Sequence, residues 1–293
     1  MATVCLTPLQ QVLEERFKQM AGCQPEWARP YPAPIPLVGR NYIPGRGLMV
    51  YASAENLTWM DRDQQHGDPR WASFRADTAR VRCQHQYQNP QLQVDRLQVK
   101  RFFPDVGMAP VSNGGLLCAA WLVLHHCHGT APSSPAELLR SIAVANWCKY
   151  VMRGRKAAGS GQRSSRNLDY VRDADKLRES LPYVRIELDV LRPRLVIMPK
   201  AICQHPDIYE AMRCASPETT FVGVMQFNAT VVNTRLNQPR FDDAAAELRS
   251  RYASTPLATW MGELTRVKPD HAWRFLAHLE NELRAARGSS STR

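Results

Sequence analysis

The chain has 293 residues, of which 44% are hydrophobic, so it is long and apolar enough for one large α/β domain with embellishments. Its 38 Lys and Arg outnumber its 27 Asp and Glu, and the formal net charge of +11 makes a polyanion, nucleic acid first, the expected partner. There is no apolar run of about 18 residues and no charged-then-apolar leader, so we predict neither membrane insertion nor secretion. We therefore expect a cytoplasmic protein whose eight cysteines, none in a C-x-x-C pair, are reduced.

The amino-terminal third begins with a predicted helix and ends in a segment without a clear period. Residues 1–24 carry apolar side chains at near-helical spacing and lead into several prolines, so we predict that 1–44 form a helix and a proline-rich cap. The apolar run from Leu48 to Ala52 predicts a first strand, which breaks into the polar loop Ser53–Asn56. Residues 58–105 are rich in Gln, Arg and Asp, and we interpret them as an insertion.

Predicted strands and helices alternate through the rest of the chain. The apolar segment Gly114–Leu124 predicts a helix buried under a sheet, and the run Ser141–Ala145 predicts a strand that closes at Asn146. A helix is expected over 169–190, with a kink at Pro182. Further strands are expected at 195–198 and 221–225, and helices at 242–252 and 270–287 make up a carboxyl-terminal segment, 241–293.

This alternation predicts an α/β fold in a single domain over 1–293. Apolar strands between helices favour a three-layer sandwich, with a mostly parallel central sheet of about four strands flanked by helices. In such sheets the loops at the carboxyl ends of the strands carry the ligand site. We therefore expect the functional side chains in those loops.

Asn146 is the first candidate, because it closes an apolar run close to the cation Lys149. Its amide offers both a donor and an acceptor, which matches the edge of a nucleobase. The alternative is a buried strand-end asparagine that bonds a neighbouring turn. Several cations are expected to neutralise phosphates, although the loop that holds most of them is also typical of a solvated linker: Lys149, Arg153, Arg155, Lys156, Arg163 and Arg166.

Two other features favour a structural role over chemistry. Three histidines and a cysteine cluster over 125–128, but adjacent residues at a helix end point in different directions and cannot share one tetrahedral ion. No metal site is therefore predicted. Trp147 and Tyr183 are expected in the core rather than as platforms for stacked bases.

Five segments, in this order, resemble the uracil-DNA glycosylase superfamily, most of all its iron–sulfur branch. They are the strand and loop of Leu48–Asn56, the helix start Ala109–Leu117, the strand end Val144–Lys149, the proline-tyrosine pair of Leu181–Tyr183, and the proline-led strand of Leu191–Ile197. The resemblance covers roughly residues 45–240. It implies a uracil-DNA glycosylase-like fold and a monofunctional DNA glycosylase, which extrudes a nucleotide and hydrolyses its N-glycosidic bond.

The site residues that the resemblance implies depart from the family pattern. The carboxylate that holds the attacking water falls near Ser53 here, so Glu55 is the expected substitute, with Ser53 and Asn56 shaping the loop. Asn228 stands where the family has a histidine that supports the leaving base. Glu55 could instead pair with a nearby arginine, and Asn228 could be a turn residue.

Other departures concern cofactor and target. Tyr150 and Ser180 stand where two cluster cysteines of the iron–sulfur branch would be, so no iron–sulfur centre and no other cofactor is expected. Val111 replaces the aromatic that the family stacks on the base, which leaves room for a base larger than uracil. Arg235 and Leu236 are expected to contact DNA, and Arg235, Leu236 or Val231 is expected to enter the gap left by the extruded nucleotide, with Leu236 as the candidate wedge.

The expected function is excision of a modified base from DNA, leaving an abasic site. Glucosylated hydroxymethylcytosine of phage DNA is the specific candidate, which would make the protein part of an anti-phage defence. The alternatives are a catalytically inactive member of the fold that only binds DNA, a repair glycosylase for uracil or another deaminated base, and a nucleotide-processing enzyme. DNA is the expected partner, no membrane partner is expected, and we expect a monomer.

Overall fold

A mixed sheet of five strands lies at the centre of the computed structural model, which describes residues 6–20, 33, 35–54, 110–129, 132–149, 174–225, 239–262 and 268–290. The strands are β1 (Leu37–Val38), β2 (Leu48–Ala54), β3 (Ile142–Cys148), β4 (Leu195–Pro199) and β5 (Thr220–Val224), in the order β1-β3-β2-β4-β5. β2 to β5 pair in parallel, and β1 runs antiparallel beside β3. The predicted α/β class and its parallel strands are confirmed, and β1 is an additional edge strand.

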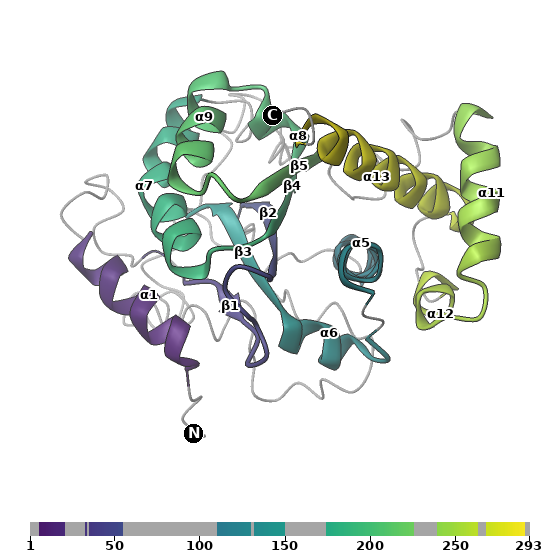
Figure 1. Ribbon diagram of the computed structural model, residues 1–293, viewed down its shortest axis with the longest axis horizontal. Helices are drawn as coiled ribbons and strands as arrows, with labels where there is room; N and C mark the ends of the chain where they lie inside the picture. Colours follow the sequence, from purple (N-terminus) through teal and green to yellow (C-terminus); the bar gives the residue numbers. More distant parts are fainter. Residues whose placement is uncertain are drawn as a thin grey trace, which may run out of the picture.

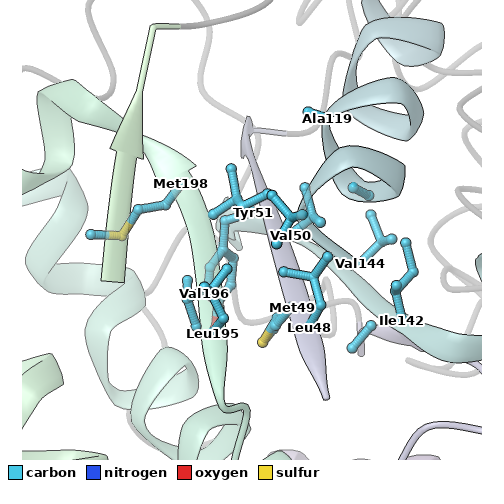
Figure 2. Packing of buried hydrophobic residues seen from close by; sticks show 14 of the residues in the cluster. Leu48, Met49, Val50, Tyr51, Ala119, Ile142, Val144, Leu195, Val196 and Met198 are labelled. Carbon is cyan, nitrogen blue, oxygen red and sulfur yellow. The ribbon is translucent and has the colours of Figure 1, made fainter. Parts of the chain in front are cut away.

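β2 is the middle of the core, because strands pair along both of its edges. Val50 of β2 pairs with Val144 of β3 on one side and with Ile197 of β4 on the other. Figure 2 shows Leu48 and Met49 between the labelled side chains of these two neighbouring strands, and neither of them is exposed to solvent (0%). A strand that is buried on both faces has a continuous apolar sequence rather than an alternating one, which is why this strand could be predicted.

Helices cover both faces of the sheet (Figure 1). One face packs against α5 (Pro110–His128) and α13 (Pro269–Ser290), which contact β2 and β5 respectively. The other face packs against α7 (Ala174–Leu191), which contacts β3 and is flanked by α1 (Pro8–Gln19) and α9 (Pro206–Ala215). The remaining described elements are α6 (Pro135–Ser141), α8 (Lys200–Cys203), η5 (Pro239–Phe241), α11 (Asp242–Arg251) and α12 (Pro256–Gly262).

The predicted helices occur in the predicted places with shifted ends. α5 extends the predicted segment in both directions, and α11 and α13 match the two predicted carboxyl-terminal helices. The insertion expected at 58–105 lies outside the described residues. Within the described ranges, no helix combines the length and the apolar character that a membrane crossing requires.

The amino-terminal helix α1 is anchored to the main body, as the sequence predicts. Thr7 caps it with a capping box, in which its Oγ1 accepts from the Gln10 backbone N–H at 3.3 Å and its own N–H donates to Gln10 Oε1 at 3.1 Å. Gln10 Nε2 also donates to the Pro36 carbonyl at 3.0 Å, although both lie in different segments of the chain. Phe17 then meets the ring of Tyr183 on α7 edge-on, with centroids 4.9 Å apart. Tyr183 is 1% exposed, so its prediction as a core residue is confirmed.

α7 runs as one helix across Pro182 and ends just before a left-handed residue. Arg192 has φ +42°, which is unusual for a residue other than glycine. Its N–H donates to the Leu188 carbonyl at 2.9 Å, and its own carbonyl accepts from Gly45 at 2.6 Å. Pro193 follows and cannot continue a helix, so the chain turns here into β4.

A glycine beside β1 provides a test of this packing. A β-carbon at Gly39 would lie 2.2 Å from the backbone oxygen of Arg140, an obstacle that no side-chain rotation can move. We expect Gly39→Ala to lower the free energy of unfolding by about 1–3 kcal/mol, measured by urea titration. Gly262→Ala is the matched control, because nothing lies within 4 Å of its β-carbon, and this helical position should tolerate alanine without loss. Equal effects of the two substitutions would contradict the packing described here.

Candidate functional site

The carboxyl ends of β2 and β4 form the switch point of the sheet, where neighbouring connections leave toward opposite faces. β2 connects onward to α5 on one face, whereas β4 connects through α8 to α9 on the other. Open α/β sheets bind their ligands in the crevice outside such a point. The loops in which the sequence predicts functional side chains follow strands that end at this edge of the sheet.

The register of β2 and β3 brings two predicted site residues onto neighbouring backbone positions. Ala52 pairs with Asn146, and Ala54 pairs with Cys148. Ser53 is therefore one step along β2 from the partner of Asn146. Both strands run two residues further than predicted, so Ser53 and Asn146 lie within strands rather than at their ends. The added residues are paired across the sheet, and that pairing extends the strands beyond their apolar runs.

Most other predicted site residues lie outside the described residues. This holds for the predicted catalytic side chains Glu55, Asn56 and Asn228, and for the predicted DNA-binding residues Arg153, Arg155, Lys156, Arg163, Arg166, Arg235 and Leu236. Val111 belongs to the first turn of α5, the helix that packs on β2. The described part of the site therefore consists of the strands and the groups that support them.

Lys149 is buried, so its predicted contact with DNA phosphates is wrong. Its side chain is 1% exposed and forms an ion pair with Glu187 of α7, which is 0% exposed. The residue stands one position beyond β3, where the chain still lies against α7. A cation with no exposure cannot reach a phosphate of bound DNA. The strand-end position suggested a loop residue, but the packing of α7 encloses it.

Glu187 connects α7 with both central strands. Its Oε1 pairs with Lys149 Nζ, and its Oε2 accepts from the Tyr51 hydroxyl at 2.7 Å. The Lys149 ammonium also lies 5.6 Å from the centroid of the Tyr51 ring. A fourth group joins the network where Ser180 Oγ accepts from the Lys149 backbone N–H at 2.9 Å. We call Tyr51, Lys149, Ser180 and Glu187 the buried tetrad.

Burial controls the protonation of the tetrad. Loss of solvent raises the pKa of Tyr51 well above its usual value, and the neighbouring Glu187 raises it further. The hydroxyl therefore stays protonated and donates. Burial also raises the pKa of Glu187, whereas the Lys149 ammonium and the Tyr51 hydrogen bond act in the opposite direction. Burial is the larger effect, so the pKa of Glu187 stays above its ordinary value, and the two partners limit that rise by stabilising the charged carboxylate.

Glu187 is not among the site residues that the sequence predicts, although the sequence contains a signal for it. Leu177, Val184, Leu188 and Leu191 of α7 are all 0% exposed and mark the buried face of the helix. Glu187 follows Val184 by three residues and precedes Leu191 by four, so it falls on that same face. A charged residue at a core position of an amphipathic helix requires a buried partner. The candidate partners for Glu187 are also visible in the sequence: Tyr51 within an apolar run, and the lysine that follows the strand ending near Asn146.

Trp147, which neighbours Asn146 on β3, is fully buried, and its prediction as a core aromatic is confirmed. Its ring meets Tyr51 edge-on, with centroids 5.4 Å apart. Among the described residues its indole Nε1 has no hydrogen-bond partner. Because Tyr51 belongs to the tetrad, this contact packs Trp147 of β3 against the tetrad.

The histidine-rich end of α5 is used in packing. His125 stacks on Trp121 with centroids 5.1 Å apart, and its Nδ1 lies 3.3 Å from the Tyr252 hydroxyl. His126 points to Glu280 of α13, with Nδ1 and Oε1 3.9 Å apart. In the described ranges, no three His, Cys, Asp or Glu side chains gather closely enough to hold a metal ion.

A cavity of about 250 Å³ lies at the other edge of the sheet, before the start of β4 and β5. It is lined by the segments around Arg192 to Arg194 and Ser216 to Glu218. Arg194 is already paired there, since its Nη1 donates to the Glu218 carbonyl at 3.2 Å. This cavity is remote from the switch point and contains none of the predicted site residues.

Removing one partner of the buried ion pair gives a test with a defined pH dependence. Lys149→Met leaves Glu187 buried without its cation, and such losses cost about 3–5 kcal/mol. Because burial is then opposed only by Tyr51, the pKa of Glu187 rises further above the unfolded value of about 4.3. The folded variant therefore binds a proton that the unfolded chain releases, and this stabilisation disappears as pH rises through the folded pKa.

We expect urea unfolding of Lys149→Met to show a larger loss of stability at pH 8 than at pH 5. Arg249→Met is the matched control, because Arg249 is 62% exposed and its Nη1 lies 3.4 Å from Asp270, which is 74% exposed. Such a surface pair contributes about 0.5 kcal/mol, so the control should change little at either pH. A loss for Lys149→Met that is the same at both pH values would show that Glu187 does not carry the effect.

Comparison of the chain with family models, with curated protein sequences and with solved structures gives no match.

Proposed function

We propose that the protein is a DNA glycosylase of the uracil-DNA glycosylase type, which extrudes a modified nucleotide and excises its base. The observation that supports this most directly is the pairing of Ala52 with Asn146. It brings an asparagine whose amide can read a base edge next to the strand that leads into Ser53, Glu55 and Asn56. The formal charge of +11 supports binding to a polyanion.

The proposed chemistry divides among three groups. The Asn146 amide hydrogen-bonds the edge of the extruded base, which fixes the base in the crevice. Glu55 orients the attacking water and stabilises positive charge that develops on the sugar. The Asn228 amide N–H donates to a carbonyl oxygen of the leaving base, which stabilises the negative charge left on it. Lys149 takes no part in phosphate binding, so the proposal assigns that role to the arginines predicted around it.

The proposed target is a base larger than uracil. Val111, in the first turn of α5, replaces the aromatic wall that the resemblance implies, and a smaller side chain leaves a wider space. Glucosylated hydroxymethylcytosine of phage DNA meets this requirement. The proposal therefore extends to a role in anti-phage defence.

The experiment incubates the protein with glucosylated phage DNA, with the same DNA lacking glucose, and with uracil-containing DNA. We expect abasic sites and a free modified base, identified by mass spectrometry, with the glucosylated DNA. Release of uracil instead would show that the protein acts on deaminated bases. DNA binding without release of any base would show a binding module, and activity on free nucleotides alone would show a nucleotide-processing enzyme.

The variant Asn146→Ala tests the contact that we assign to the base edge. Loss of a base-edge contact costs about 1–3 kcal/mol, so Asn146→Ala should slow base release about ten- to a hundredfold with little change in DNA retention. Asn41→Ala is the matched control, because Asn41 is an exposed asparagine in the turn before β2, at the opposite edge of the sheet. Equal rates for Asn146→Ala and Asn41→Ala would remove Asn146 from the site.

A further inference from the structure

We propose that Glu187 is a positioning residue, which holds the carboxyl ends of β2 and β3 in register through Tyr51 and Lys149. This inference rests on the proposed function, because Asn146 lies in β3 and Glu55 follows the end of β2. Glu187 itself touches neither DNA nor water in the proposed reaction. It acts through the backbone that carries Ser53 and Asn146.

The geometry of the carboxylate supports this role. Its two oxygens bind different strands, since Oε1 pairs with Lys149 after β3 and Oε2 accepts from Tyr51 of β2 at 2.7 Å. Tyr51 lies two residues before Ser53, and Lys149 lies three residues after Asn146. One side chain therefore fixes both strands close to the positions where the proposed site residues stand.

Ser180 supplies a second anchor for the same segment. Its Oγ accepts from the Lys149 backbone N–H at 2.9 Å, and Ser180 and Glu187 lie about two turns apart on one face of α7. Lys149 is thus held at its backbone and at its ammonium by the same helix. The chain that leaves β3 cannot slide along α7 without breaking both contacts.

A gain in stability does not explain why Lys149 and Glu187 are buried as a charged pair. Lys149, Glu187 and Tyr51 are at most 1% exposed, so the ion pair has lost its hydration. Replacing such a pair by apolar residues of similar volume is often neutral or stabilising. Hydrogen bonds and ion pairs depend on direction, so they allow only one arrangement of β2, β3 and α7. A slip of one residue in a strand would turn every side chain to the opposite face and separate Asn146 from Ala52.

The test replaces the charged network by apolar groups, in the triple variant Tyr51→Phe/Lys149→Met/Glu187→Leu. The substitutions remove both members of the ion pair and the hydroxyl bonded to it together, so we expect thermal unfolding at or near the wild-type temperature. We expect kcat for base release to fall about ten- to a hundredfold, because misplacement of reacting groups by about 1 Å has effects of this size. DNA affinity should stay within about threefold, since the variant keeps the net charge of wild type.

Glu210→Leu/Arg213→Met is the matched control. It removes one negative and one positive charge from an exposed ion pair on α9, whose atoms lie 3.6 Å apart, and leaves the net charge unchanged. We expect wild-type kcat for this control. A kcat of the triple variant within twofold of wild type would overturn the proposal, as would an equal loss in the control.

Hydrogen–deuterium exchange separates a failure of this inference from a failure of the proposed function. We expect faster amide exchange over 48–54 and 142–148 in the triple variant and no change there in the control. If wild type releases no base, the proposed function fails, whereas exchange still tests the register. If the triple variant does not fold, Tyr51→Phe alone tests the contact from β2. Unchanged exchange over 48–54 together with unchanged kcat in Tyr51→Phe would overturn the proposal.

Discussion

The parallel pairing of β2 with β3 is the constraint on which the site depends. Ala52 pairs with Asn146 because Leu48 and Ile142 start the two strands level with each other. That start is fixed by a core in which both faces are covered by helices, so a shift of register would carry apolar side chains out of contact. The position of Asn146 is therefore a consequence of packing at the other end of the strands.

The buried tetrad lies between this core and the switch point. α7 packs against β3, and Lys149, the residue after β3, lies against the same helix. A lysine there can be enclosed only with a partner, and Glu187 supplies it from the buried face of the helix. The ion pair also lowers the positive charge near the carboxyl ends of β2 and β3, because Glu187 neutralises Lys149 below the surface.

Local patterns in the sequence predict the sheet well and the site only in part. The continuous apolar runs of β2, β4 and β5 exist because both faces of the sheet are covered, and such runs are recognisable without a structure. β1 has only two residues, and it becomes a strand through its pairing with Val144 and Ala143, which no local pattern encodes. α9 was also missed, although Pro206 at its first turn and buried Ile208 and Met212 at helical spacing are a readable signal.

The errors at the site have a common physical reason. Lys149 was expected at the surface because lysines usually are, and only the contact with a residue 38 positions away in the sequence makes its burial possible. The sequence predicts that β2 and β3 end earlier than they do, for the same reason. Ala54 and Cys148 extend the two strands by pairing with each other. Contacts between distant segments determine both the burial of Lys149 and the ends of β2 and β3. The residues next to each position in the sequence do not reveal these contacts.

The most direct test of the account is a crystal structure with DNA that carries the modified nucleotide as a non-cleavable 2′-fluoro analogue. We expect an extruded nucleotide at the carboxyl ends of β2 and β4, with its base edge within about 3 Å of the Asn146 amide. A nucleotide that stays stacked in the duplex, or DNA bound instead at the cavity beside Arg192 and Arg194, would contradict it.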